Sequence, residues 1–326
     1  MLTEKLYQAH HNNPTPNILV IGDLMLDHYL FGSATRLSPE APVPIVKANK
    51  ESKIIGGAAN VASNLIDLGA KVYLGGVVGN DEFADDVKKL LEAKGINSQL
   101  IINDESRITT VKTRVIVGNH QIVRIDKEDS HNISADLESS LFAFLSPYIQ
   151  KADIVVLSDY NKGLITPSLS LKIITYCNSI GKKTLVDPKG LDYSKYEGAF
   201  LIKPNRKELA EAAKSENIST NEDLVKAARV ILEATKATYL IVTLSEAGIA
   251  IITKDDYTIL PVAATEVYDV TGAGDTVIAT LAYCLALGFN MEESATIANH
   301  AASIVIKHIG SATTNIDEII ASLKND

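Results

Sequence analysis

Hydrophobic residues occur along the chain in short β-branched runs that alternate with longer amphipathic segments. The runs are apolar almost throughout, as expected of strands covered on both faces of a sheet. They lie at residues 17–23, 71–79, 152–159, 182–188, 199–205 and 238–244. The intervening segments carry apolar residues at helical spacing, and several end in Gly, a common helix stop. They span residues 56–69, 81–95, 135–150, 166–181 and 205–217.

This alternation predicts an α/β fold, with a doubly wound, mostly parallel sheet and helices on both faces. Two segments break the pattern: residues 36–53 are extended and punctuated by Pro, and residues 108–126 form a predicted hairpin that turns at Gly118-Asn119. We expect both to pair in a small antiparallel β sheet that serves as a lid, a dimer contact, or both. The prediction is therefore one domain over residues 1–326, with a β lid from about 36–53 and 105–127.

Composition and charge narrow the class of protein. The 326 residues are 46% hydrophobic and 22% charged, as in ordinary globular proteins. The net charge of −9 is spread along the chain, which argues against nucleic acid or an anionic membrane as the main partner. The first residues lack a signal-peptide pattern and no apolar run reaches about 18 residues, so we expect a cytoplasmic protein. Cys177 and Cys284 have no partner at metal-ligand spacing, so neither a disulfide nor a zinc site is expected.

The stretch DVTGAGD, from Asp269 to Asp275, carries the first candidate chemistry. Gly272 and Gly274 permit a tight turn, and an apolar helix is predicted from Asp275 to Gly288. Helix N-termini bind phosphate and developing oxyanions. Asp275 is then either a helix cap or a general base, whose pKa is expected to stay low because nearby N–H groups favour the ionised form. A base beside an anion site suits phosphoryl transfer to an alcohol.

Other phosphate motifs are missing. The chain contains no GxxxxGK[ST], and no predicted strand is followed by GxGxxG. The P-loop and dinucleotide-binding interpretations therefore lose their main support.

Three motifs resemble those of the ribokinase-like (PfkB) carbohydrate kinases. DVTGAGDT, residues 269–276, resembles the C-terminal signature of that family, and GGAANVASNLIDLG, from Gly56, resembles its N-terminal glycine-pair signature. NRKE, from Asn205 to Glu208, resembles its NxxE magnesium motif and follows a predicted strand. Because the motifs occur in the family's order across nearly the whole chain, the match is specific, and it implies a ribokinase-like fold and an ATP-dependent sugar kinase.

Further stretches narrow the resemblance within the family. GDLMLDHYLFG, RLSPEAPVPIVK, LSDYNKG and VDPKG are similar to the members that phosphorylate D-glycero-β-D-manno-heptose 7-phosphate in lipopolysaccharide-core synthesis. This resemblance implies phosphorylation of the C1 hydroxyl to give the 1,7-bisphosphate. In many bacteria this kinase is fused to a nucleotidyltransferase with an HxGH-type motif. The sequence ends at Asp326 without one, so we expect a stand-alone kinase or the kinase half.

The resemblance also implies roles for individual residues. Asp275 would be the catalytic base, with an anion hole at Gly272, Ala273 and Gly274. The ATP site would comprise Asn205, Glu208, Thr243, Ser245, Gly248 and Asn299. The sugar site would comprise Asp23, Asp27, Gly56, Gly57 and Asn60, since carboxylates accept from sugar hydroxyls. Asn205 and Glu208 would organise Mg²⁺ through water, and the backbone carbonyls of Asp269 and Thr271 would bind a monovalent cation such as K⁺.

A sugar phosphate also requires cationic partners. Arg114 and Arg124 lie on opposite arms of the predicted hairpin, and Lys162 and Lys189 follow predicted core strands. Arg can bind phosphate with two hydrogen bonds, which favours the two arginines for the 7-phosphate. They are equally consistent with solvated hairpin charges, and Lys189 could face ATP in place of sugar.

Several alternatives remain at this level. Asp275 could be only a helix cap, and Asn205 with Glu208 has the pattern of a capping box. The acceptor could be another sugar phosphate, a sugar or a nucleoside, or the protein could be a non-catalytic nucleotide or sugar sensor. The apolar alternation of the lid strands predicts a homodimer formed through the lid.

Overall fold

The computed structural model describes residues 1–262, 267–308 and 310–325. Its main sheet has nine strands in the order β13-β12-β11-β10-β9-β8-β1-β4-β5. Only β12 and β13 run antiparallel to their neighbours, so the predicted mostly parallel sheet is confirmed. The strands are β1 (Asn17–Gly22), β4 (Lys71–Val78), β5 (Ile101–Asn103), β8 (Ile154–Ser158), β9 (Lys183–Asp187), β10 (Leu201–Ile202), β11 (Tyr239–Thr243), β12 (Ile249–Ile252) and β13 (Tyr257–Leu260).

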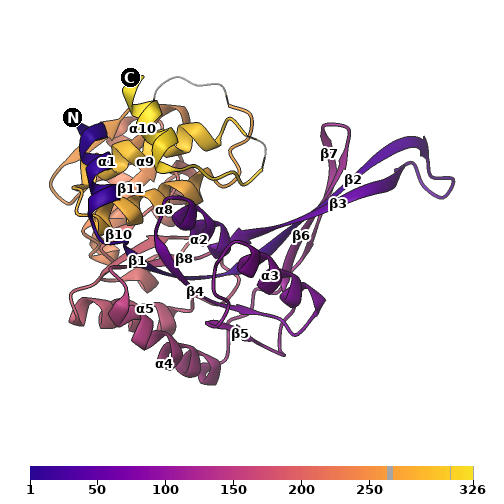
Figure 1. Cartoon of the computed structure of the whole chain (residues 1–326), viewed down its shortest axis with the longest axis horizontal. Coiled ribbons are helices and arrows are strands. Elements are labelled where there is room, and N and C mark those ends of the chain that lie inside the picture. The colour runs from indigo at the N-terminus through magenta and orange to yellow at the C-terminus, as the bar shows by residue number, and fades with distance from the viewer. Residues whose placement is uncertain (263–266, 309, 326) are drawn as a thin grey trace.

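Helices cover both faces of this sheet (Figure 1). Successive residues of β1 show why: Ile18 and Val20 belong to one hydrophobic core, while Leu19 and Ile21 belong to a second. The first core is shared with α1 (Leu2–Asn12), α2 (Ala58–Asp67), α3 (Glu82–Ala93), α8 (Ala273–Ala286), α9 (Met291–Val305) and α10 (Ile316–Lys324). The second is shared with α4 (Ala135–Lys151), α5 (Pro167–Ser179), α6 (Arg206–Ala212) and α7 (Asn221–Thr235). The doubly wound prediction is thus confirmed.

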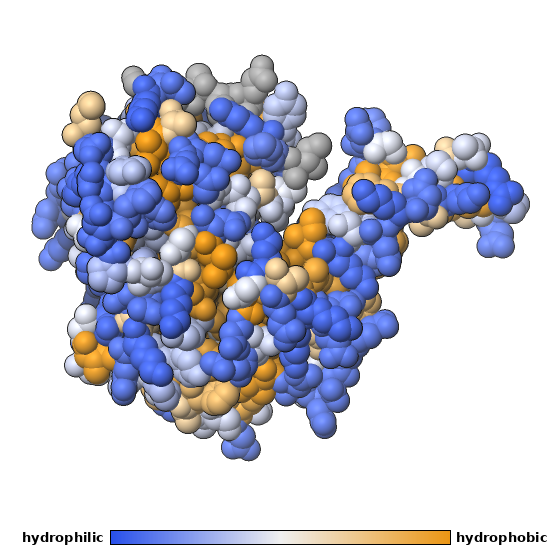
Figure 2. Space-filling view, viewed as in Figure 1, coloured by the Kyte–Doolittle hydropathy of each residue, from blue (hydrophilic) through white to orange (hydrophobic). Residues whose placement is uncertain are grey.

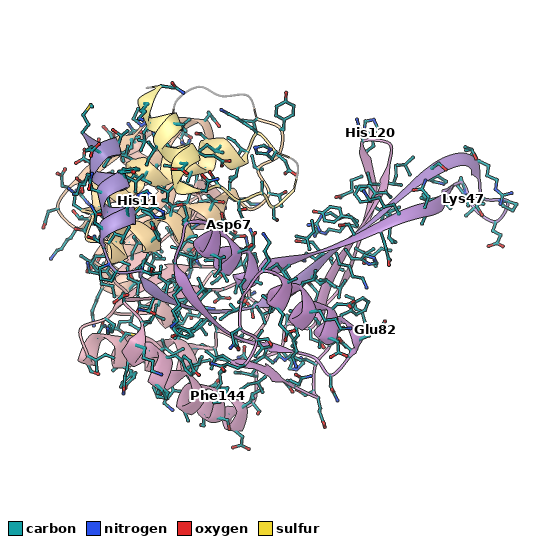
Figure 3. The ribbon with its side chains drawn as sticks, in the orientation of Figure 1. His11, Lys47, Asp67, Glu82, His120 and Phe144 are labelled. Atoms are coloured by element: carbon teal, nitrogen blue, oxygen red, sulfur yellow. The ribbon has the colours of Figure 1, made fainter. Side chains whose placement is uncertain are left out.

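A four-stranded sheet projects from the body as an arm (Figure 1). Its order is β3-β2-β6-β7, made of β2 (Leu24–Leu37), β3 (Pro44–Gly57), β6 (Thr110–Val117) and β7 (His120–Lys127). The β2–β3 and β6–β7 pairs are antiparallel, and the central β2–β6 pair is parallel. Lys47 and His120 lie toward the outer parts of the two hairpins (Figure 3). The sequence predicted a small sheet here and its turn at Gly118-Asn119. The predicted all-antiparallel pairing of residues 36–53 with the hairpin is wrong, because β2 lies between them and runs parallel to β6.

The arm exposes apolar side chains on its surface (Figure 2). Every residue of β7 is exposed, including Ile122, Val123 and Ile125, and so is Leu37 at the end of β2. This exposure is consistent with the predicted lid or dimer contact, but dimerisation stays a prediction.

Some boundaries differ from those predicted. The helix expected over residues 205–217 ends at Ala212, and Lys214 adopts a left-handed backbone with φ of 53°. The helix expected from Asp275 begins two residues earlier, at Ala273. Cys177 and Cys284 are both buried and free of disulfide bonds among the described residues. Among the residues that the structure describes, no helix is both long and apolar enough to cross a bilayer.

Candidate active site

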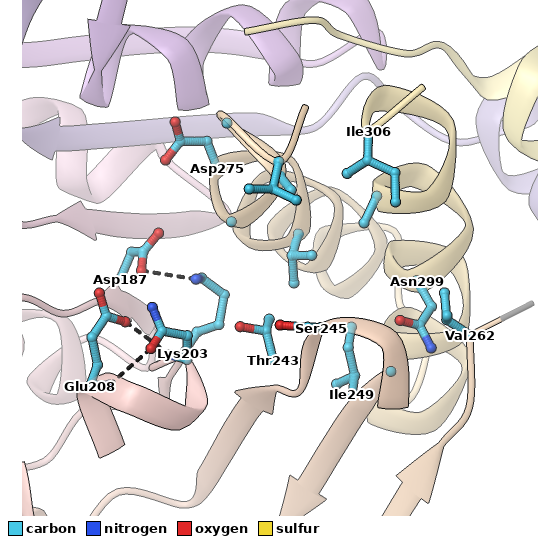
Figure 4. A pocket seen from close by; sticks show the side chains of 18 of the residues that line it. Asp187, Lys203, Glu208, Thr243, Ser245, Ile249, Val262, Asp275, Asn299 and Ile306 are labelled. Atoms are coloured by element: carbon cyan, nitrogen blue, oxygen red, sulfur yellow. Dashed lines mark hydrogen bonds and ion pairs between the residues drawn. The ribbon is translucent and has the colours of Figure 1, made fainter. Parts of the chain in front are cut away.

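A cavity of about 750 Å³ opens where the parallel strands β8, β9, β10 and β11 end. Ligands of open α/β sheets bind at this carboxyl edge. Figure 4 shows Asp275 at one side of the cavity and Asn299 at the other, beside Ile249, Val262 and Ile306. Eleven of the predicted site residues line this cavity: Lys189, Asn205, Glu208, Thr243, Ser245, Gly248, Gly272, Ala273, Gly274, Asp275 and Asn299.

The carboxylate of Asp275 is buried in the first turn of α8 and accepts a hydrogen bond on each oxygen. The side-chain amide of Asn60, on α2, donates to Oδ2 at 2.7 Å. The hydroxyl of Tyr160, just after β8, donates to Oδ1 at 2.7 Å. Two donors from separate elements therefore hold this carboxylate at the cavity wall.

The expected low pKa of Asp275 is wrong. Burial raises the pKa of this carboxyl above its ordinary value, and the hydrogen bonds from Asn60 and Tyr160 and the charge of Lys203 oppose that rise. The sequence argument counted the helix N–H groups but not the loss of hydration, which disfavours the charged form. A raised pKa makes the carboxylate a better proton acceptor.

A glycine is required at position 272, just before α8, because of its backbone conformation and because the Asn60 side chain lies close to it. Its φ is +80°, in the left-handed region, and a Cβ there would lie 2.9 Å from Nδ2 of Asn60. The Ala273 N–H donates to the Val270 carbonyl at 3.2 Å. Gly274 and Asp275 follow in the first helical turn, where N–H groups lack intrahelical acceptors, so they are the better anion donors. The anion hole at residues 272–274 stays a prediction.

Lys203 and Asp187 form a buried ion pair in the cavity wall, with Nζ 2.9 Å from Oδ1 (Figure 4). Burial raises the pKa of Asp187 to about 7; the charge of Lys203 opposes this shift, and that of Asp275 adds to it. Lys203 Nζ also lies 3.3 Å from the position that a Cβ on Gly274 would occupy. A cation therefore lies directly beside the glycine turn.

Asn205 and Glu208 form the capping box of α6. The Asn205 side chain accepts from the Glu208 N–H at 2.9 Å, and the Glu208 carboxylate accepts from the Asn205 N–H at 2.9 Å. The second Glu208 oxygen accepts from Lys189 Nζ at 2.6 Å. The capping interpretation is confirmed, and because both side chains also line the cavity, a magnesium role stays open.

The described residues contain no group of three or more His, Cys, Asp or Glu placed to hold a metal directly. Asp187, Asn205 and Glu208 nevertheless bring oxygen donors to the same cavity wall. Mg²⁺ usually retains several waters and takes only one or two protein carboxylates besides phosphate oxygens. The donor set therefore fits a magnesium ion held through water.

The opposite end of the cavity combines polar backbone with apolar side chains. Thr243 ends β11, and Ser245 begins a short 3-10 turn before Gly248. The side-chain amide of Asn299 donates to the carbonyls of Leu260 and Pro261, at 3.0 and 3.2 Å. Asn299 thus supports the wall of this pocket, whose apolar lining is suited to a flat base.

Asp27 and Arg114 form an ion pair where the arm meets the body. Asp27 is on β2 and Arg114 on β6, and both side chains are largely buried. Gly56 allows this arrangement, because a Cβ there would lie 2.7 Å from Oδ2 of Asp27. Gly57 has a φ of 63° and is the N-cap of α2, which carries Asn60 toward Asp275.

The carboxylate of Asp23 contacts backbone groups. It is almost fully buried and accepts from the N–H groups of Tyr160, Lys162 and Leu164, at 2.8, 3.2 and 3.3 Å. Burial raises its pKa to about 6, with a smaller contribution from the charge of Asp159, while these N–H groups lower it. Asp23 therefore holds the loop after β8, and its predicted contact with sugar stays untested.

The remaining predicted cations lie in an ionic cluster beside the arm. Arg124 pairs with Asp126 and is 48% exposed, and Lys162 pairs with Glu128 at 2.7 Å. Lys112, which the sequence analysis did not single out, pairs with both acids. Arg124 and Arg114 lie on opposite arms of the hairpin, as predicted, and are register partners on β7 and β6. Neither arginine lines the main cavity.

Asp269 and Thr271 shape the turn before α8. One Asp269 oxygen accepts from the Thr271 N–H at 2.9 Å and from its hydroxyl at 2.7 Å, and the other accepts from the Gly310 N–H at 2.8 Å. Asp269 thus ties the turn to the loop after α9. Cation binding by the backbone carbonyls stays a prediction.

Three residues of the site were missed by sequence reasoning: Tyr160, Asp187 and Lys203. Each stands at or just after the end of a parallel strand, in LSDY, VDP and LIKP. Their position at the carboxyl edge was the available signal. It was applied to Lys162, Lys189 and the NRKE motif but not to the end of every strand.

The family model described as "pfkB family carbohydrate kinase" matches residues 15–318. The chain is 48% identical over 305 residues to the "Bifunctional protein HldE" of Sulfurimonas denitrificans, covering 94% of this chain and 64% of that protein. It is 49% identical over 302 residues to the protein of the same name from Helicobacter pylori strain HPAG1, covering 93% and 65%. The chain thus spans somewhat less than two thirds of these relatives.

Solved structures with the same fold include two kinases of low sequence identity. Arabidopsis thaliana ribokinase, complexed with ribose and ATP, superposes with a TM-score of 0.76 at 19% identity, covering 95% of this chain and 99% of that one. Escherichia coli phosphofructokinase-2, in complex with potassium, superposes with a TM-score of 0.78 at 19% identity, covering 95% and 100%. These superpositions show a ribokinase-like fold.

Proposed function

Because the chain belongs to the pfkB family of carbohydrate kinases, we propose that it transfers the γ-phosphoryl group of ATP to the C1 hydroxyl of D-glycero-D-manno-heptose 7-phosphate. The products are the 1,7-bisphosphate and ADP. The observation that carries the proposal is the buried Asp275 carboxylate, in the first turn of α8 and on the wall of the cavity that holds the NxxE motif.

The chemistry follows from this placement. The C1 hydroxyl gives its proton to Asp275 as its oxygen bonds to the γ-phosphorus, and the bond from that phosphorus to the β–γ bridging oxygen breaks. The electron pair of that bond leaves with ADP. First-turn N–H groups of α8 and the Lys203 ammonium face the charge on the transferring group. In-line transfer needs mainly such positioning and charge stabilisation.

We assign ATP to the cavity because one end of the cavity is apolar and the other is polar. The apolar wall at Ile249, Val262 and Ile306 accepts the base, and the polar wall at Asn205 and Glu208 accepts the phosphates. Asn205 and Glu208, with Asp187 nearby, would hold Mg²⁺ through water, and the ion would neutralise phosphate charge when bound. The Asp269 and Thr271 carbonyls are assigned to a monovalent cation. The proposal places the protein in the cytoplasm, where ATP is available.

Heptose 7-phosphate is favoured as acceptor by the sequence resemblance of the β1–β2 segment, the arm and the loop after β8. The ionic cluster supports it, because its cations Arg124, Lys112 and Lys162, together with the nearby Arg114, lie in the region between the arm and the body. Their present partners are carboxylates, which a phosphate dianion could replace. The exposed apolar residues of β7 support a homodimer formed through the arm.

Product analysis tests the proposal. Incubation with ATP, Mg²⁺ and heptose 7-phosphate should give a second sugar phosphorus resonance, coupled to the anomeric proton in ³¹P NMR, with one ADP per product. Fructose 6-phosphate, ribose and unphosphorylated heptose serve as comparison acceptors. Faster turnover of any of these, or phosphorylation at another carbon, would contradict the assignment.

A further inference from the structure

The Asp275 carboxylate depends on a loop that is itself held by a second buried carboxylate. Tyr160 donates its hydroxyl to Asp275 Oδ1 at 2.7 Å and its backbone N–H to Asp23 Oδ2 at 2.8 Å. Tyr160 therefore connects the end of β1 to the first turn of α8 through two hydrogen bonds. The motif chemistry of the proposed kinase does not require either contact.

Asp23 fixes the backbone of this loop. It accepts further N–H groups from Lys162 and Leu164, at 3.2 and 3.3 Å, and has no ion-pair partner among the described residues. A buried carboxylate without a cation is costly unless N–H donors satisfy it. Because residues 160, 162 and 164 donate to one side chain, the loop has little freedom to move away from Asp275.

We propose that Asp23 and Tyr160 are positioning residues: Asp23 fixes the loop after β8, and the Tyr160 hydroxyl, together with Asn60, orients the Asp275 carboxylate toward the acceptor hydroxyl. This inference rests on the proposed role of Asp275 in phosphoryl transfer. It gives Asp23 a task that acts through Tyr160, instead of the sugar contact expected from the sequence.

Orientation matters because the terminal torsion of an Asp side chain is broad and roughly two-fold. One hydrogen bond would leave the carboxylate plane free to rotate, whereas donors from α2 and from the loop after β8 fix it. Each oxygen accepts one of these bonds and keeps a second acceptor direction, which an incoming hydroxyl can use.

Tyr160 remains a donor throughout. Burial, followed by the charge of Asp275, raises the pKa of its phenol well above the ordinary value, so it does not compete as a base. The other charged groups facing Asp275 are Lys203, which favours its ionised form, and Asp27, which disfavours it. Asp187 is also close enough to interact with its charge. Removal of the Tyr160 hydroxyl alone changes none of these charges.

The principal test is Tyr160→Phe, which keeps the ring and removes the hydroxyl. We expect kcat to fall about tenfold on the pH plateau, because the base loses its fixed orientation. The acid limb of the kcat profile should move upward by about one pH unit, because a hydrogen bond to the ionised form is lost. The KM values for ATP and sugar should change less than about twofold, since uniform binding is retained.

Tyr283→Phe is the matched control. Tyr283 is a buried tyrosine on α8, eight residues after Asp275. Its hydroxyl forms a hydrogen bond with His10 Nδ1 at 2.7 Å. This substitution removes a tyrosine hydrogen bond as long as that of Tyr160 with Asp275, but outside the cavity. The kcat and the acid limb of the variant should therefore match wild type. Unchanged kcat and limb in Tyr160→Phe, or equal changes in both variants, would overturn the role of Tyr160.

A titration without substrate separates this inference from the proposed reaction. The ¹³C carboxyl resonance of Asp275 can be assigned by its loss in Asp275→Asn and followed with pH in wild type and Tyr160→Phe. We expect the midpoint to rise by about one unit in the variant. If wild type fails to phosphorylate heptose 7-phosphate, the proposed acceptor is wrong. If the Asp275 midpoint does not move in Tyr160→Phe, the proposed role of Tyr160 is wrong.

Asp23→Asn tests whether Asp23 fixes the loop after β8. Folding is checked by circular dichroism, and the expected result is a lower kcat and a raised Asp275 midpoint with the sugar KM within about twofold of wild type. A raised sugar KM with unchanged kcat and midpoint would show that Asp23 binds sugar. If the variant does not fold, amide exchange in wild type decides: the N–H groups of residues 160, 162 and 164 should exchange at least about 100-fold slower than an open loop. Rapid exchange at all three would overturn the proposal.

Discussion

Lys203 Nζ lies 2.9 Å from Oδ1 of Asp187 beside the glycine turn, and the two side chains are only 4% and 15% exposed. Removal of one partner should leave the other charge buried and uncompensated. We predict that Lys203→Met lowers the free energy of unfolding by about 3 kcal/mol at pH 8, measured by urea denaturation.

The pH dependence gives this prediction a sign. Asp187 has a pKa of about 7 with Lys203 present, and loss of the cation should raise it further. The variant carboxyl is then neutral at pH 6, so the destabilisation should be smaller at pH 6 than at pH 8. The double variant Asp187→Asn/Lys203→Met should recover most of the lost stability; equal damage in both variants would contradict the pairing argument.

Asp275→Asn tests the proposed base. The substituted amide oxygen can still accept from Asn60, and the Tyr160 hydroxyl can rotate to accept from the new amide, so the fold should be retained. We expect kcat to fall by about 10² to 10⁴ with the ATP dissociation constant within about threefold of wild type. Calorimetric ATP binding and a coupled ADP assay measure the two quantities. Near-normal turnover of the folded variant would remove Asp275 as base.

Replacement of Arg114 and of Arg124 should have different effects on stability, although the sequence predicted a phosphate-binding role for both. Arg114→Ala leaves the buried Asp27 without its cation and should cost about 3 kcal/mol of stability. Arg124→Ala should cost less than about 1 kcal/mol, because that side chain is 48% exposed.

Kinetics complete this comparison. We expect Arg124→Ala to raise the KM for heptose 7-phosphate about tenfold while the KM for unphosphorylated heptose stays unchanged. Thermal unfolding and steady-state kinetics with the two sugars supply the measurements. An equal rise for both sugars would place Arg124 outside the 7-phosphate site.

Asn205 allows capping and metal organisation to be separated. Asn205→Ser retains a good N-cap for α6, whereas Asn205→Ala removes it and should cost about 1 kcal/mol. If Asn205 also orders the waters of Mg²⁺, Asn205→Ser should raise the Mg²⁺ concentration for half-maximal activity about tenfold with the melting temperature preserved. A wild-type magnesium dependence in the folded Ser variant would leave Asn205 with the capping role alone.

Asp23 predicts a particular dependence of stability on pH. Its folded pKa of about 6 lies above the ordinary value, so the folded state holds the extra proton at intermediate pH. Stability from this group is present below about pH 4, falls as pH rises to about 6, and is constant above that. The advantage of wild type over Asp23→Asn should therefore shrink by about 3 kcal/mol between pH 4 and pH 7. Chemical denaturation at several pH values measures this gap; a gap that widens with pH would contradict the assignment.

The sequence predicted the sheet and eleven residues that line the cavity proposed for ATP, because both depend on local patterns. β-branched runs become buried parallel strands, and DVTGAGD and NRKE each place their polar residues on one turn before a helix. It did not predict β2 as a strand of the arm, because that strand is buried for its first four residues, half-buried along its middle and exposed near its end, with no single period. It also missed the contacts of Tyr160 and Lys203, which join residues distant in sequence.

The pKa of Asp275 also depends on contacts between distant parts of the sequence, which the sequence does not reveal. The sequence reveals the N–H groups that favour the ionised carboxylate, since they belong to the same turn. It does not reveal the depth of burial, which depends on α2, the loop after β8 and β10 meeting at one point. Burial is a property of the assembled core, and here it determines the direction of the shift.

β2 is a single 14-residue strand whose buried start carries Asp27 and whose exposed end forms the arm. At about 3.3 Å per residue this strand extends over roughly 45 Å. A second copy of the chain bound at its outer part would therefore contact the same strand that carries the Asp27–Arg114 pair at its inner end. By thermodynamic reciprocity, any change in sugar affinity caused by association at the arm must appear as an equal change in association caused by sugar.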